Sequence, residues 1–357
     1  MSEPSLGLVE VVGAGLLGTS IGLACRRAGI EVVLSDVSAE HVRTASGLGA
    51  GRSRSADDRP SLVVVAVPPA HLAAAITDAL QNTQAVVTDV GSVKGRPLTD
   101  VVRRVDPAQL RRYVGSHPMA GSERSGPLTA SAALFDGRPW AITPHDTSAP
   151  EAVETVSRLV EVCGAVSTLL TPGEHDKAVA RTSHLPHLAA VLVAGRLAGA
   201  PADHLALSGQ GVRDVTRIAA SDPVMWEQIL SANSDAVTAL LSELSHDLDH
   251  LIAAVRDGEH ATLIEILGAG VLGTEAIPGK HGAPARPTRS VFVSVPDHPG
   301  ELARLFGDAG EIGVNIEDVH IDHDPGRPVG LTELVVDEEQ SGHLLAALES
   351  RGWTTHR

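Results

Sequence analysis

The sequence predicts an α/β protein with three parts: an N-terminal parallel sheet, an all-helical middle part and a small C-terminal domain of order βαββαβ. Three observations lead to this prediction. Up to about residue 170, short apolar runs rich in β-branched residues alternate with helical stretches, as in βαβ units. From 171 to about 275, strand patterns vanish and apolar residues recur at helical spacing. From 290 onward, strand and helix patterns alternate again.

The candidate strands of the N-terminal part are continuous apolar runs, which are typical of strands buried on both faces. These runs are residues 8–12, 31–35, 62–67, 85–88 and 140–143. Apolar residues at helical spacing mark the middle part. They are found in residues 185–197, 224–254 and 261–271.

A segment rich in Pro, Gly and Arg, residues 276–289, has the composition of a linker. Beyond it the pattern predicts strand, helix, strand, strand and helix, and a last strand in the tail would complete a ferredoxin-like βαββαβ unit. The predicted elements are residues 290–295, 300–312, 316–321, 331–336 and 341–351. We therefore expect domains at 1–170, 171–278 and 289–357, joined by a linker at 279–288.

The composition limits the classes of function. The chain has 357 residues, enough for two to three domains. A formal net charge of −16 and only 2% aromatic residues argue against nucleic-acid binding, which needs clustered cations and stacking surfaces. The sequence has no membrane-spanning stretch and no leader-like N-terminus, so we expect a cytoplasmic protein. Cys25 and Cys163 form no CxxC pair, which argues against a disulfide framework or a zinc ribbon.

A strand pattern runs directly into a helix pattern through Gly13, Gly15 and Gly18, which form a GxGxxG motif. The motif has the context that dinucleotide binding requires: a strand before it, a helix after it, and a second strand ending in an acidic residue. Gly13 permits the tight turn, Gly15 lets the backbone approach a pyrophosphate, and Gly18 lets helix pack on strand. The helix N-terminus would attract the phosphates.

The acidic residue is Asp36. Its carboxylate would accept hydrogen bonds from the ribose hydroxyls and repel a 2′-phosphate, which favours NAD over NADP. Arg43 lies seven residues further on, so the preference need not be strict, and capping of the turn at 37–38 is the alternative role of Asp36. The expected cofactor contacts are Gly13, Ala14, Gly15, Leu16, Leu17, Gly18, Asp36 and Val67.

Two loops expected after later strands, residues 88–95 and 115–126, carry unusual polar residues. Ligands of open α/β sheets bind outside the carboxyl ends of the strands, so both loops should face the nicotinamide. Ser92 and His117 are the candidate polar pair. Lys94 either contacts the cofactor or is a solvated loop lysine, and the sequence leaves both open.

Polar residues of the helical part cluster in two places. Ser183 and His187 lie four residues apart in SHLPH. Asp214, Arg217 and Ser221 are spaced by three and four residues, which would place them on one face of a helix. An exposed Asp–Arg pair is the alternative reading of that face.

Five motifs together resemble the prephenate/arogenate dehydrogenase family. They are GAGLLGTSI, DVGSVKG, SHPMAGSERSG, TSHLPH and RDVTRIAASDP, and they occur in family order within residues 6 to about 275. The segments PDHPGELARLF and GVNIEDVHI resemble an ACT regulatory domain. The resemblance implies a Rossmann-type NAD-binding domain, a helical substrate-binding and dimerisation domain, and a C-terminal ACT domain.

The resemblance implies NAD-dependent oxidative decarboxylation of prephenate to 4-hydroxyphenylpyruvate, CO₂ and NADH, a step of tyrosine biosynthesis. His117 would accept the proton or hydrogen bond of the C4 hydroxyl, and Ser92 would orient His117 or that hydroxyl. Arg217 would bind a substrate carboxylate. The other residues that the resemblance places around the substrate are His187, Ser183, Ser122, Glu123, Asp214, Ser221 and Trp226.

Three alternatives compete with this function. Arogenate carries an ammonium where prephenate carries a ketone, and His187 suits the keto acid better, so arogenate dehydrogenase is the second choice. A 3-hydroxy-acid or ketol-acid type dehydrogenase is disfavoured, because Lys177, the early lysine of the helical part, lies outside any motif. A non-catalytic sensor of NAD and an amino acid would have no use for a proton acceptor.

The ACT-like domain suggests feedback by tyrosine, the end product of the pathway. Asp297, Pro299 and Gly300 form a turn before a helix whose N-terminus can bind an α-carboxylate, and Asn315 would reach the ligand from a neighbouring copy. Dimerisation without a ligand is the alternative role of this domain. We also expect a homodimer, because the helical part is long and apolar, and such surfaces bury one another in related enzymes.

Two histidine groups could suggest a metal. His246 and His250 lie four residues apart, and the sequence HIDHD at 320–324 combines two histidines with two aspartates. Neither group has further ligands at the spacing of known metal sites, and hydride transfer to NAD needs no metal. We therefore expect surface residues here and no metal site.

Overall fold

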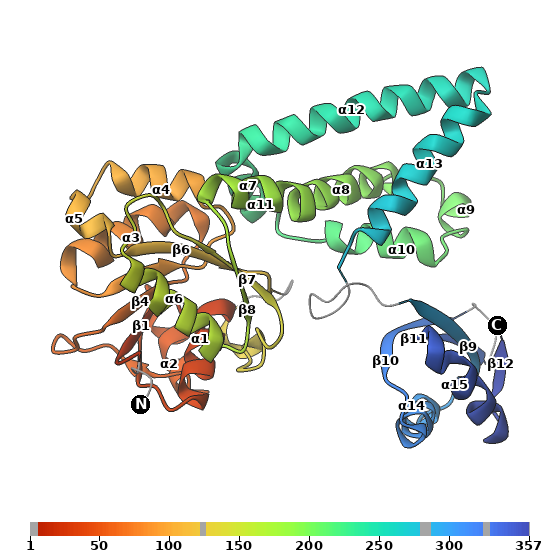
Figure 1. The fold of residues 1–357 in the computed structure, drawn as a ribbon, viewed down its shortest axis with the longest axis horizontal. Coiled ribbons are helices and arrows are strands. Elements are labelled where there is room, and N and C mark those ends of the chain that lie inside the picture. The colour runs from red at the N-terminus through yellow and green to blue at the C-terminus, as the bar shows by residue number, and fades with distance from the viewer. Residues whose placement is uncertain (1–5, 122–125, 279–286, 324–328, 357) are drawn as a thin grey trace. The chain divides into compact units, whose positions relative to one another are not determined.

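The structure is a computed structural model that describes residues 6–121, 126–278, 287–323 and 329–356 (Figure 1). The chain forms two compact units, Met1–His250 and Leu251–Arg357, and the division falls within the long helix α12 (Ser234–Asp257). The domain borders expected from the sequence differ from this division and stay predictions. Ser122 and Glu123, expected near the substrate, lie outside the described residues.

An eight-stranded sheet of order β3-β2-β1-β4-β5-β6-β7-β8 forms the centre of the first unit. Its strands are β1 (Val9–Val12), β2 (Val32–Ser35), β3 (Arg52–Ser53), β4 (Leu62–Val65), β5 (Val86–Asp89), β6 (Tyr113–Pro118), β7 (Pro139–Thr143) and β8 (Val166–Leu169). The five predicted runs are present as β1, β2, β4, β5 and β7, which confirms the α/β class. The strands β3, β6 and β8 were not predicted.

The sheet is mixed, so the prediction of a parallel sheet is wrong at one edge. The strands from β3 to β6 pair in parallel, but β7 runs antiparallel to β6, and β8 is parallel to β7. In its described part, the connection from β6 to β7 holds only the short 3₁₀ turn η1 (Pro127–Thr129). A parallel return needs a crossover, usually a helix, and without one the chain reverses direction.

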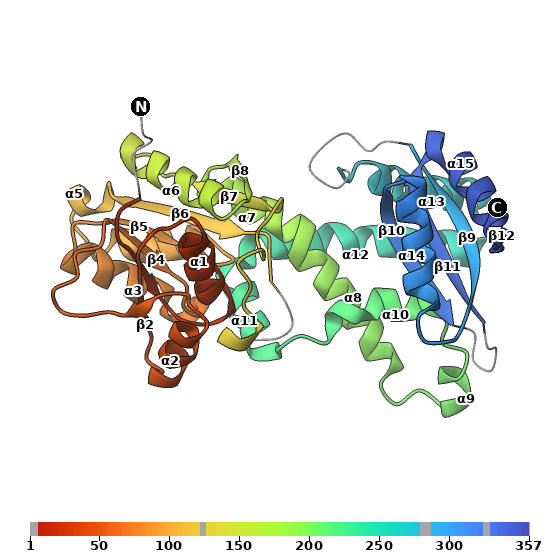
Figure 2. The same ribbon diagram turned by 90° about the horizontal axis from the view of Figure 1, so that it is seen from below.

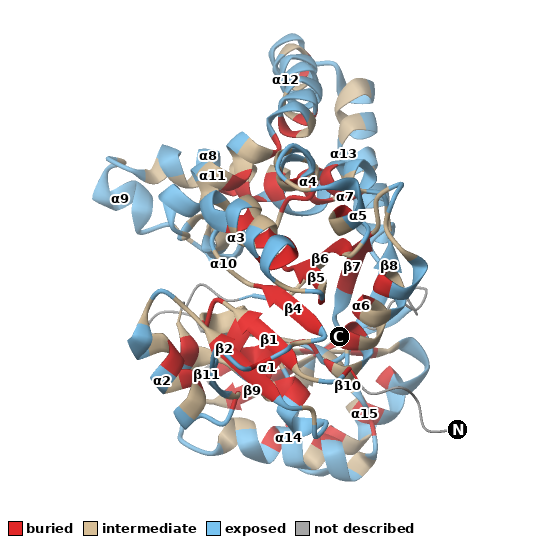
Figure 3. Ribbon diagram, turned by 90° about the vertical axis from the view of Figure 1, so that its left-hand side faces the viewer, coloured by how far each residue is buried: buried red, intermediate tan, exposed pale blue. Residues whose placement is uncertain are grey.

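Helices cover both faces of this sheet. They are α1 (Leu16–Arg27), α2 (Ala39–Gly47), α3 (Pro69–Asn82), α4 (Gly95–Val102), α5 (Pro107–Leu110) and α6 (Pro150–Val162). Leu62 and Val64 of β4 join the core with α1, α2 and α6, whereas Val63 and Val65 join the core with α3 and α4. Figure 3 shows β1, β2 and β4 buried. Burial on both faces explains why these strands are continuously apolar.

The helical part follows β8 and confirms the predicted change of pattern. Its described elements are α7 (Pro172–Val179), the π-helical turn η2 (Ala180–His184), α8 (Leu185–Leu197), α9 (Ala202–Leu205), α10 (Gln210–Thr216), the 3₁₀ turn η3 (Arg217–Ala219), α11 (Pro223–Ala232), α12 and α13 (His260–Glu275). The segment 224–254, expected to be helical, forms two helices, because Asn233 leaves the helical conformation. Its buried amide instead donates to the Asp176 carbonyl at 2.8 Å.

The helix face expected for Asp214, Arg217 and Ser221 is wrong. Helix α10 ends at Thr216, and η3 and a bend follow, so the three residues do not share one regular helix. Asp214 is exposed and accepts a hydrogen bond from Gln210 Nε2 at 2.8 Å. Both Asp214 and Arg217 are exposed, as the alternative reading of this segment expected.

The C-terminal domain has the predicted order βαββαβ. Its elements are β9 (Thr288–Pro296), α14 (Glu301–Ile312), β10 (Ile316–His323), β11 (Val329–Asp337), α15 (Glu338–Ser350) and β12 (Thr354–His356). The antiparallel sheet has the order β10-β11-β9-β12, which is the ferredoxin-like arrangement. Helices α14 and α15 pack on one face of this sheet (Figure 2).

Candidate active site

The turn between β1 and α1 has the geometry that a pyrophosphate requires. Gly13 has φ +104°, and a Cβ there would lie 2.4 Å from the Ala66 carbonyl oxygen. A Cβ on Gly18 would lie 1.9 Å from the Gly13 carbonyl oxygen, so the close contact of helix and strand needs glycine. A Cβ on Gly15 would have no atom within 4 Å, so this side of the turn is open. The three glycines therefore fit the roles expected for a dinucleotide site.

Asp36 lies beside this turn at the end of β2. Its carboxylate accepts hydrogen bonds from the backbone N–H of Ala14 at 2.6 Å and of Ser38 at 2.7 Å. The bond to Ser38 is the turn-capping role, and the bond to Ala14 fixes the carboxylate next to the glycine-rich turn. Both expected functions of Asp36 are therefore compatible, since each carboxylate oxygen has a further lone pair for a ribose hydroxyl.

His117 lies within strand β6, not in a loop as expected. The strands β1, β4, β5 and β6 are parallel, so their carboxyl ends share one edge of the sheet. His117 is the fifth of six residues of β6 and therefore lies at the edge where the glycine-rich turn follows β1. This is the edge where open α/β sheets bind their ligands.

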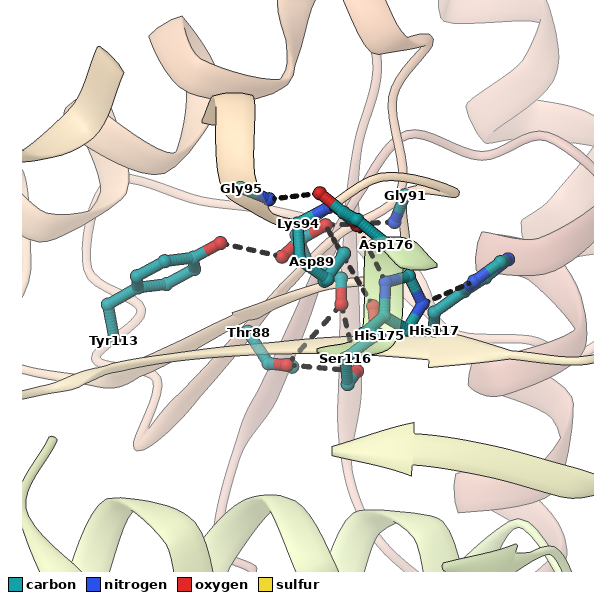
Figure 4. A network of polar contacts seen from close by, with 10 residues as sticks. All are labelled: Thr88, Asp89, Gly91, Lys94, Gly95, Tyr113, Ser116, His117, His175 and Asp176. Carbon is teal, nitrogen blue, oxygen red and sulfur yellow. Dashed lines mark hydrogen bonds and ion pairs between the residues drawn. The ribbon is translucent and has the colours of Figure 1, made fainter. Parts of the chain in front are cut away.

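The side chain of His117 is joined to two residues of helix α7. His117 Nδ1 lies 3.0 Å from His175 Nε2, and His175 Nδ1 lies 2.8 Å from Asp176 Oδ1 (Figure 4). Asp176 also accepts hydrogen bonds from the backbone N–H of Lys94 and of Gly95, both at 2.8 Å. The carboxylate thus rests on the N-terminus of α4, which favours negative charge.

Lys94 forms a second buried group on the other side of this network (Figure 4). Its side chain is 1% exposed, and Nζ donates to the Asp89 carboxylate and to the Ser116 carbonyl at 2.6 Å. The Tyr113 hydroxyl donates to the other Asp89 oxygen at 2.8 Å. The alternative of a solvated loop lysine is therefore wrong, because the β5–α4 turn folds Lys94 inward against β6.

The electrostatic environment keeps His117 uncharged. Burial lowers the pKa of His117 well below its ordinary value, and electrostatic interactions with Lys94, His175 and His184 act in the same direction. A neutral imidazole has one ring nitrogen with a free lone pair, so it can accept a hydrogen bond or a proton. Burial also lowers the pKa of Lys94, while the Asp89 carboxylate opposes that shift.

Ser92 does not form the pair with His117 that the sequence suggested. Both residues are described, and no hydrogen bond joins them; the partner of His117 is His175. Ser92 is half-buried and lines a cavity of about 200 Å³ together with residues of α3, α4 and α11. A role for Ser92 in orienting the substrate stays a prediction.

A second group of rings lies in the helical part. The His187 ring stacks on Trp226 with a centroid distance of 3.5 Å, and His184 meets the same Trp226 edge-on at 5.9 Å. Burial lowers the pKa of both histidines, for His184 to about 4. The structure thus brings together His187 and Trp226, two of the residues expected at the substrate. Ser183 is exposed in η2, and Ser221 is half-buried beyond η3.

The sequence reasoning missed His175 and Asp176. The signal that could have found them is a His–Asp pair directly after a helix start, Thr171-Pro172, whose threonine caps α7. His175 is 1% exposed, which is unusual for a polar residue so close to a helix N-terminus. Lys94, Asp89 and Tyr113 carried no local signal that they meet.

Other parts of the described chain have no comparable chemistry. In the described residues, no group of three or more His, Cys, Asp or Glu side chains is arranged to hold a metal ion. His246 and His250 on α12 are exposed, as expected. None of the described helices is long and apolar enough to cross a membrane.

Comparisons with known proteins agree with this geometry. Residues 21–169 match the nucleotide-binding domain of prephenate dehydrogenase, and residues 171–269 match its dimerisation domain. The chain is 36% identical to a probable prephenate dehydrogenase, NovF, of Streptomyces niveus, over 96% of this chain and 98% of that protein. It is 27% identical to the prephenate dehydrogenase of Bacillus subtilis, over 88% and 87% of the two chains.

The fold also matches a solved structure. This is the crystal structure of prephenate dehydrogenase from A. aeolicus in complex with hydroxyphenyl propionate and NAD⁺. The two structures align over 77% of this chain and 100% of that chain, with 28% sequence identity and a TM-score of 0.70. The two family matches together span residues 21–169 and 171–269, which include His117 in the sheet and His175 and His187 in the helical part. The chain therefore belongs to the prephenate dehydrogenase family.

Proposed function

We propose that the chain catalyses the NAD-dependent oxidative decarboxylation of prephenate to 4-hydroxyphenylpyruvate and CO₂. The observation that supports this most directly is His117, a neutral imidazole at the carboxyl edge of the sheet, on the same edge as the glycine-rich turn. When bound, the nicotinamide supplies the acceptor for the hydride that leaves C4 of the substrate. NAD is the cofactor that the open Gly15 and the carboxylate of Asp36 accommodate.

His117 acts on the C4 hydroxyl of the substrate. Accepting a hydrogen bond or proton from this hydroxyl raises the electron density on its oxygen, which helps to expel the hydride. The ring carboxylate leaves as CO₂ and its electron pair completes the aromatic ring. The product is a phenol, so the proton drawn toward His117 returns to the same oxygen and the reaction releases no net proton.

The remaining residues bind the substrate. Arg217 contacts a substrate carboxylate through its planar guanidinium group, and its exposure leaves its donors available. His187, stacked on Trp226, and Ser183 meet the pyruvyl side chain. Ser92 orients the C4 hydroxyl. The outer contacts are Asp214 and Ser221, together with Ser122 and Glu123, which lie outside the described residues.

Prephenate fits the site better than arogenate. Burial holds His187 neutral, and the one further contact that shifts its pKa is a hydrogen bond with the Ile218 backbone. An ammonium group would need a carboxylate partner, and the imidazole of His187 does not provide one. A neutral imidazole can instead donate a hydrogen bond to a ketone.

The test is the formation of NADH by the purified protein, followed by its absorbance with prephenate or arogenate as substrate. We expect a higher kcat/KM with prephenate than with arogenate, and with NAD⁺ than with NADP⁺. Asp36→Ser should reduce the preference for NAD⁺, since the carboxylate no longer repels a 2′-phosphate. A protein that binds NAD⁺ but reduces none with either substrate would be a sensor, and the proposed function would be wrong.

We infer that the protein works as a homodimer in the cytoplasm. The family model for residues 171–269 describes a dimerisation domain. Helix α13 supports this inference, because it is mostly apolar and none of its residues is buried in the single chain. Exposed apolar side chains on it include Ile264, Leu267, Val271 and Leu272. A large exposed apolar surface is the usual sign of a protein interface.

We further propose that the C-terminal domain is an ACT-type regulatory domain that binds tyrosine. Gly300 has φ +97° directly before the twelve-residue helix α14, so the turn formed with Asp297 and Pro299 needs a glycine there. The N-terminus of this helix suits the α-carboxylate of an amino acid. Asn315 is exposed and donates a hydrogen bond to Glu317. At the surface, its side chain can contact a ligand that is bound to a neighbouring copy of the domain.

A further inference from the structure

The buried pair His175 and Asp176 has no role in the function derived above. His175 is 1% exposed and Asp176 is 8% exposed, and burying two such polar groups is unfavourable unless their hydrogen bonds are satisfied. The pair lies between the N-terminus of α4 and the ring of His117 (Figure 4). Its contacts define a continuous chain of hydrogen bonds from a carboxylate to the proposed proton acceptor.

The direction of each hydrogen bond in this chain follows from the carboxylate. An ionised carboxylate can only accept, so the 2.8 Å contact with Asp176 Oδ1 requires a proton on His175 Nδ1. A neutral His175 then has a lone pair on Nε2. His117 Nδ1, 3.0 Å away, must therefore be the protonated nitrogen and donate to it. His117 Nε2 is left with the free lone pair.

Asp176 is itself held in place by main-chain groups. Oδ1 accepts from the Lys94 N–H and Oδ2 from the Gly95 N–H, so the carboxylate spans the amides of the N-cap residue and of the first residue of α4. A Cβ on residue 95 would lie 2.9 Å from Oδ2, so glycine is what permits this approach. The Asn233 amide donates to the Asp176 carbonyl at 2.8 Å and anchors the same residue from the junction between α11 and α12.

The charges that face His117 explain why such support is needed. The ammonium of Lys94 and the rings of His175 and His184 all disfavour a proton on His117, and burial adds to them. The Asp89 carboxylate forms an ion pair with Lys94, so its charge is already balanced by that ammonium. Asp176 is the carboxylate connected to His117, through one intervening ring. It can compensate the positive charge that appears when His117 accepts a proton.

We propose that His175 and Asp176 are positioning residues that hold His117 in the Nδ1-protonated tautomer, presenting Nε2 to the substrate hydroxyl, and that stabilise the imidazolium once it forms. This rests on the proposed function of His117 as the acceptor. In known catalytic triads a carboxylate orients the catalytic imidazole directly. Here Asp176 would orient His117 through a second imidazole, that of His175. These hydrogen bonds join β6 to α7, the first helix after the sheet. The sheet and the helical part are therefore in contact at His117.

The first measurement is the tautomer of His117 in the wild-type protein. NMR spectra of protein labelled with ¹⁵N-histidine distinguish the two ring nitrogens, and His117→Asn identifies the signals of this residue. We expect a protonated Nδ1 and an unprotonated Nε2 at pH 8. The opposite tautomer in the wild-type protein would overturn the proposal. This result is independent of turnover, so it stands apart from a failure of the proposed function.

The second measurement uses Asp176→Asn, which keeps the shape of the side chain but removes its charge. We expect kcat with prephenate to fall by roughly 10²-fold or more, with KM for prephenate and NAD⁺ little changed, because acceptance of the proton is impaired and binding is not. The matched control is Glu174→Gln on the same helix, an exposed carboxylate that pairs with Lys177, and it should leave kcat unchanged. Wild-type kcat in Asp176→Asn would overturn the proposal.

A third variant covers the case in which Asp176→Asn fails to fold. His175→Phe keeps a ring in the buried space and leaves Asp176 its two backbone donors. We expect the same loss of kcat and, in the NMR spectra, a His117 no longer confined to the Nδ1-protonated form. If the fold is retained and His117 keeps its tautomer and its kcat, the contact with His175 is structural and the proposal is wrong.

Discussion

The histidines near the candidate active site differ from solvent-exposed ones because burial keeps them neutral. The pKa values of His117, His184 and His187 all lie below the ordinary value, and burial is the largest cause in each. Neutral rings can accept a proton from a hydroxyl or donate a hydrogen bond to a ketone. The same burial makes the fold sensitive to acid, since protonating these rings is unfavourable in the folded state.

His117→Asn tests the proton acceptor at the scale of one residue. Asparagine keeps a polar side chain but has no basic nitrogen, so we expect kcat to fall by roughly 10²–10⁴-fold with KM little changed. The pKa of His117 is lowered, so the acid limb of the wild-type kcat/KM profile should lie below pH 6.5, the ordinary value of a histidine. The variant should lack that limb. Near-normal turnover in the variant would remove His117 from the mechanism.

His184→Gln tests how burial links stability to pH. The pKa of His184 is lowered from 6.5 to about 4, so between these values the unfolded chain binds a proton that the folded chain does not. The free energy of unfolding is therefore highest above pH 6.5 and falls as the pH drops, by about 2 kcal/mol between pH 7 and 5 from this residue. Urea titrations at both pH values should show that loss reduced by about 2 kcal/mol in His184→Gln.

The control for this experiment is His246→Gln, which replaces an exposed histidine on α12. It should keep the pH dependence of the wild-type protein. Glutamine at 184 retains an acceptor for the Asn233 amide, which lies 3.3 Å from His184 Nδ1 in the wild-type protein. An unchanged pH dependence in His184→Gln would contradict the role of its burial.

At the scale of elements, the site depends on how closely α4 approaches α7. Gly95→Ala would place a Cβ 2.9 Å from Asp176 Oδ2, against a carboxylate already bound by two backbone amides. We expect a loss of about 1–3 kcal/mol in the free energy of unfolding, as for other overpacked positions. Thermal and urea unfolding measure this loss, and kcat should fall as well because Asp176 shifts.

Gly173→Ala is the matched control for this change. Gly173 lies in the first turn of α7, and a Cβ there would have no atom within 4 Å. Alanine favours a helix over glycine, so the stability should stay equal or rise by up to ~1 kcal/mol. If both variants lost the same stability, the close approach of Asp176 would not be the cause.

At the scale of the whole molecule, the C-terminal domain can act on catalysis only if tyrosine binds two states of the protein with different affinity. We expect tyrosine to inhibit the full chain, and a chain ending near residue 280 to stay active without this response. Initial rates with and without tyrosine measure both. Inhibition that survives truncation would mean that tyrosine competes at the catalytic site, and absence of binding by calorimetry would leave dimerisation as the role of the domain.

Much of the fold could be predicted from the sequence because its signals are local. The apolar runs, the glycine spacing at 13, 15 and 18, and the βαββαβ order each depend on residues close together in the chain. The direction of β7 could not be predicted in this way. It depends on a connection without a crossover helix. The apolar run of β7, which contains Trp140, would look the same in a parallel and in an antiparallel strand.

The sequence by itself determined the α/β class and the dinucleotide turn, and it predicts His117 as the acceptor, since short motifs and their local backbone carry that information. Only the tertiary structure decided which groups surround His117. His175 lies 58 residues away in the sequence, and the Lys94 and Gly95 amides lie 82 and 81 residues from Asp176. Such contacts arise when separate elements pack, and no local preference encodes them. The same packing buried Lys94 and left Arg217 exposed, and so decided two questions that the sequence had left open.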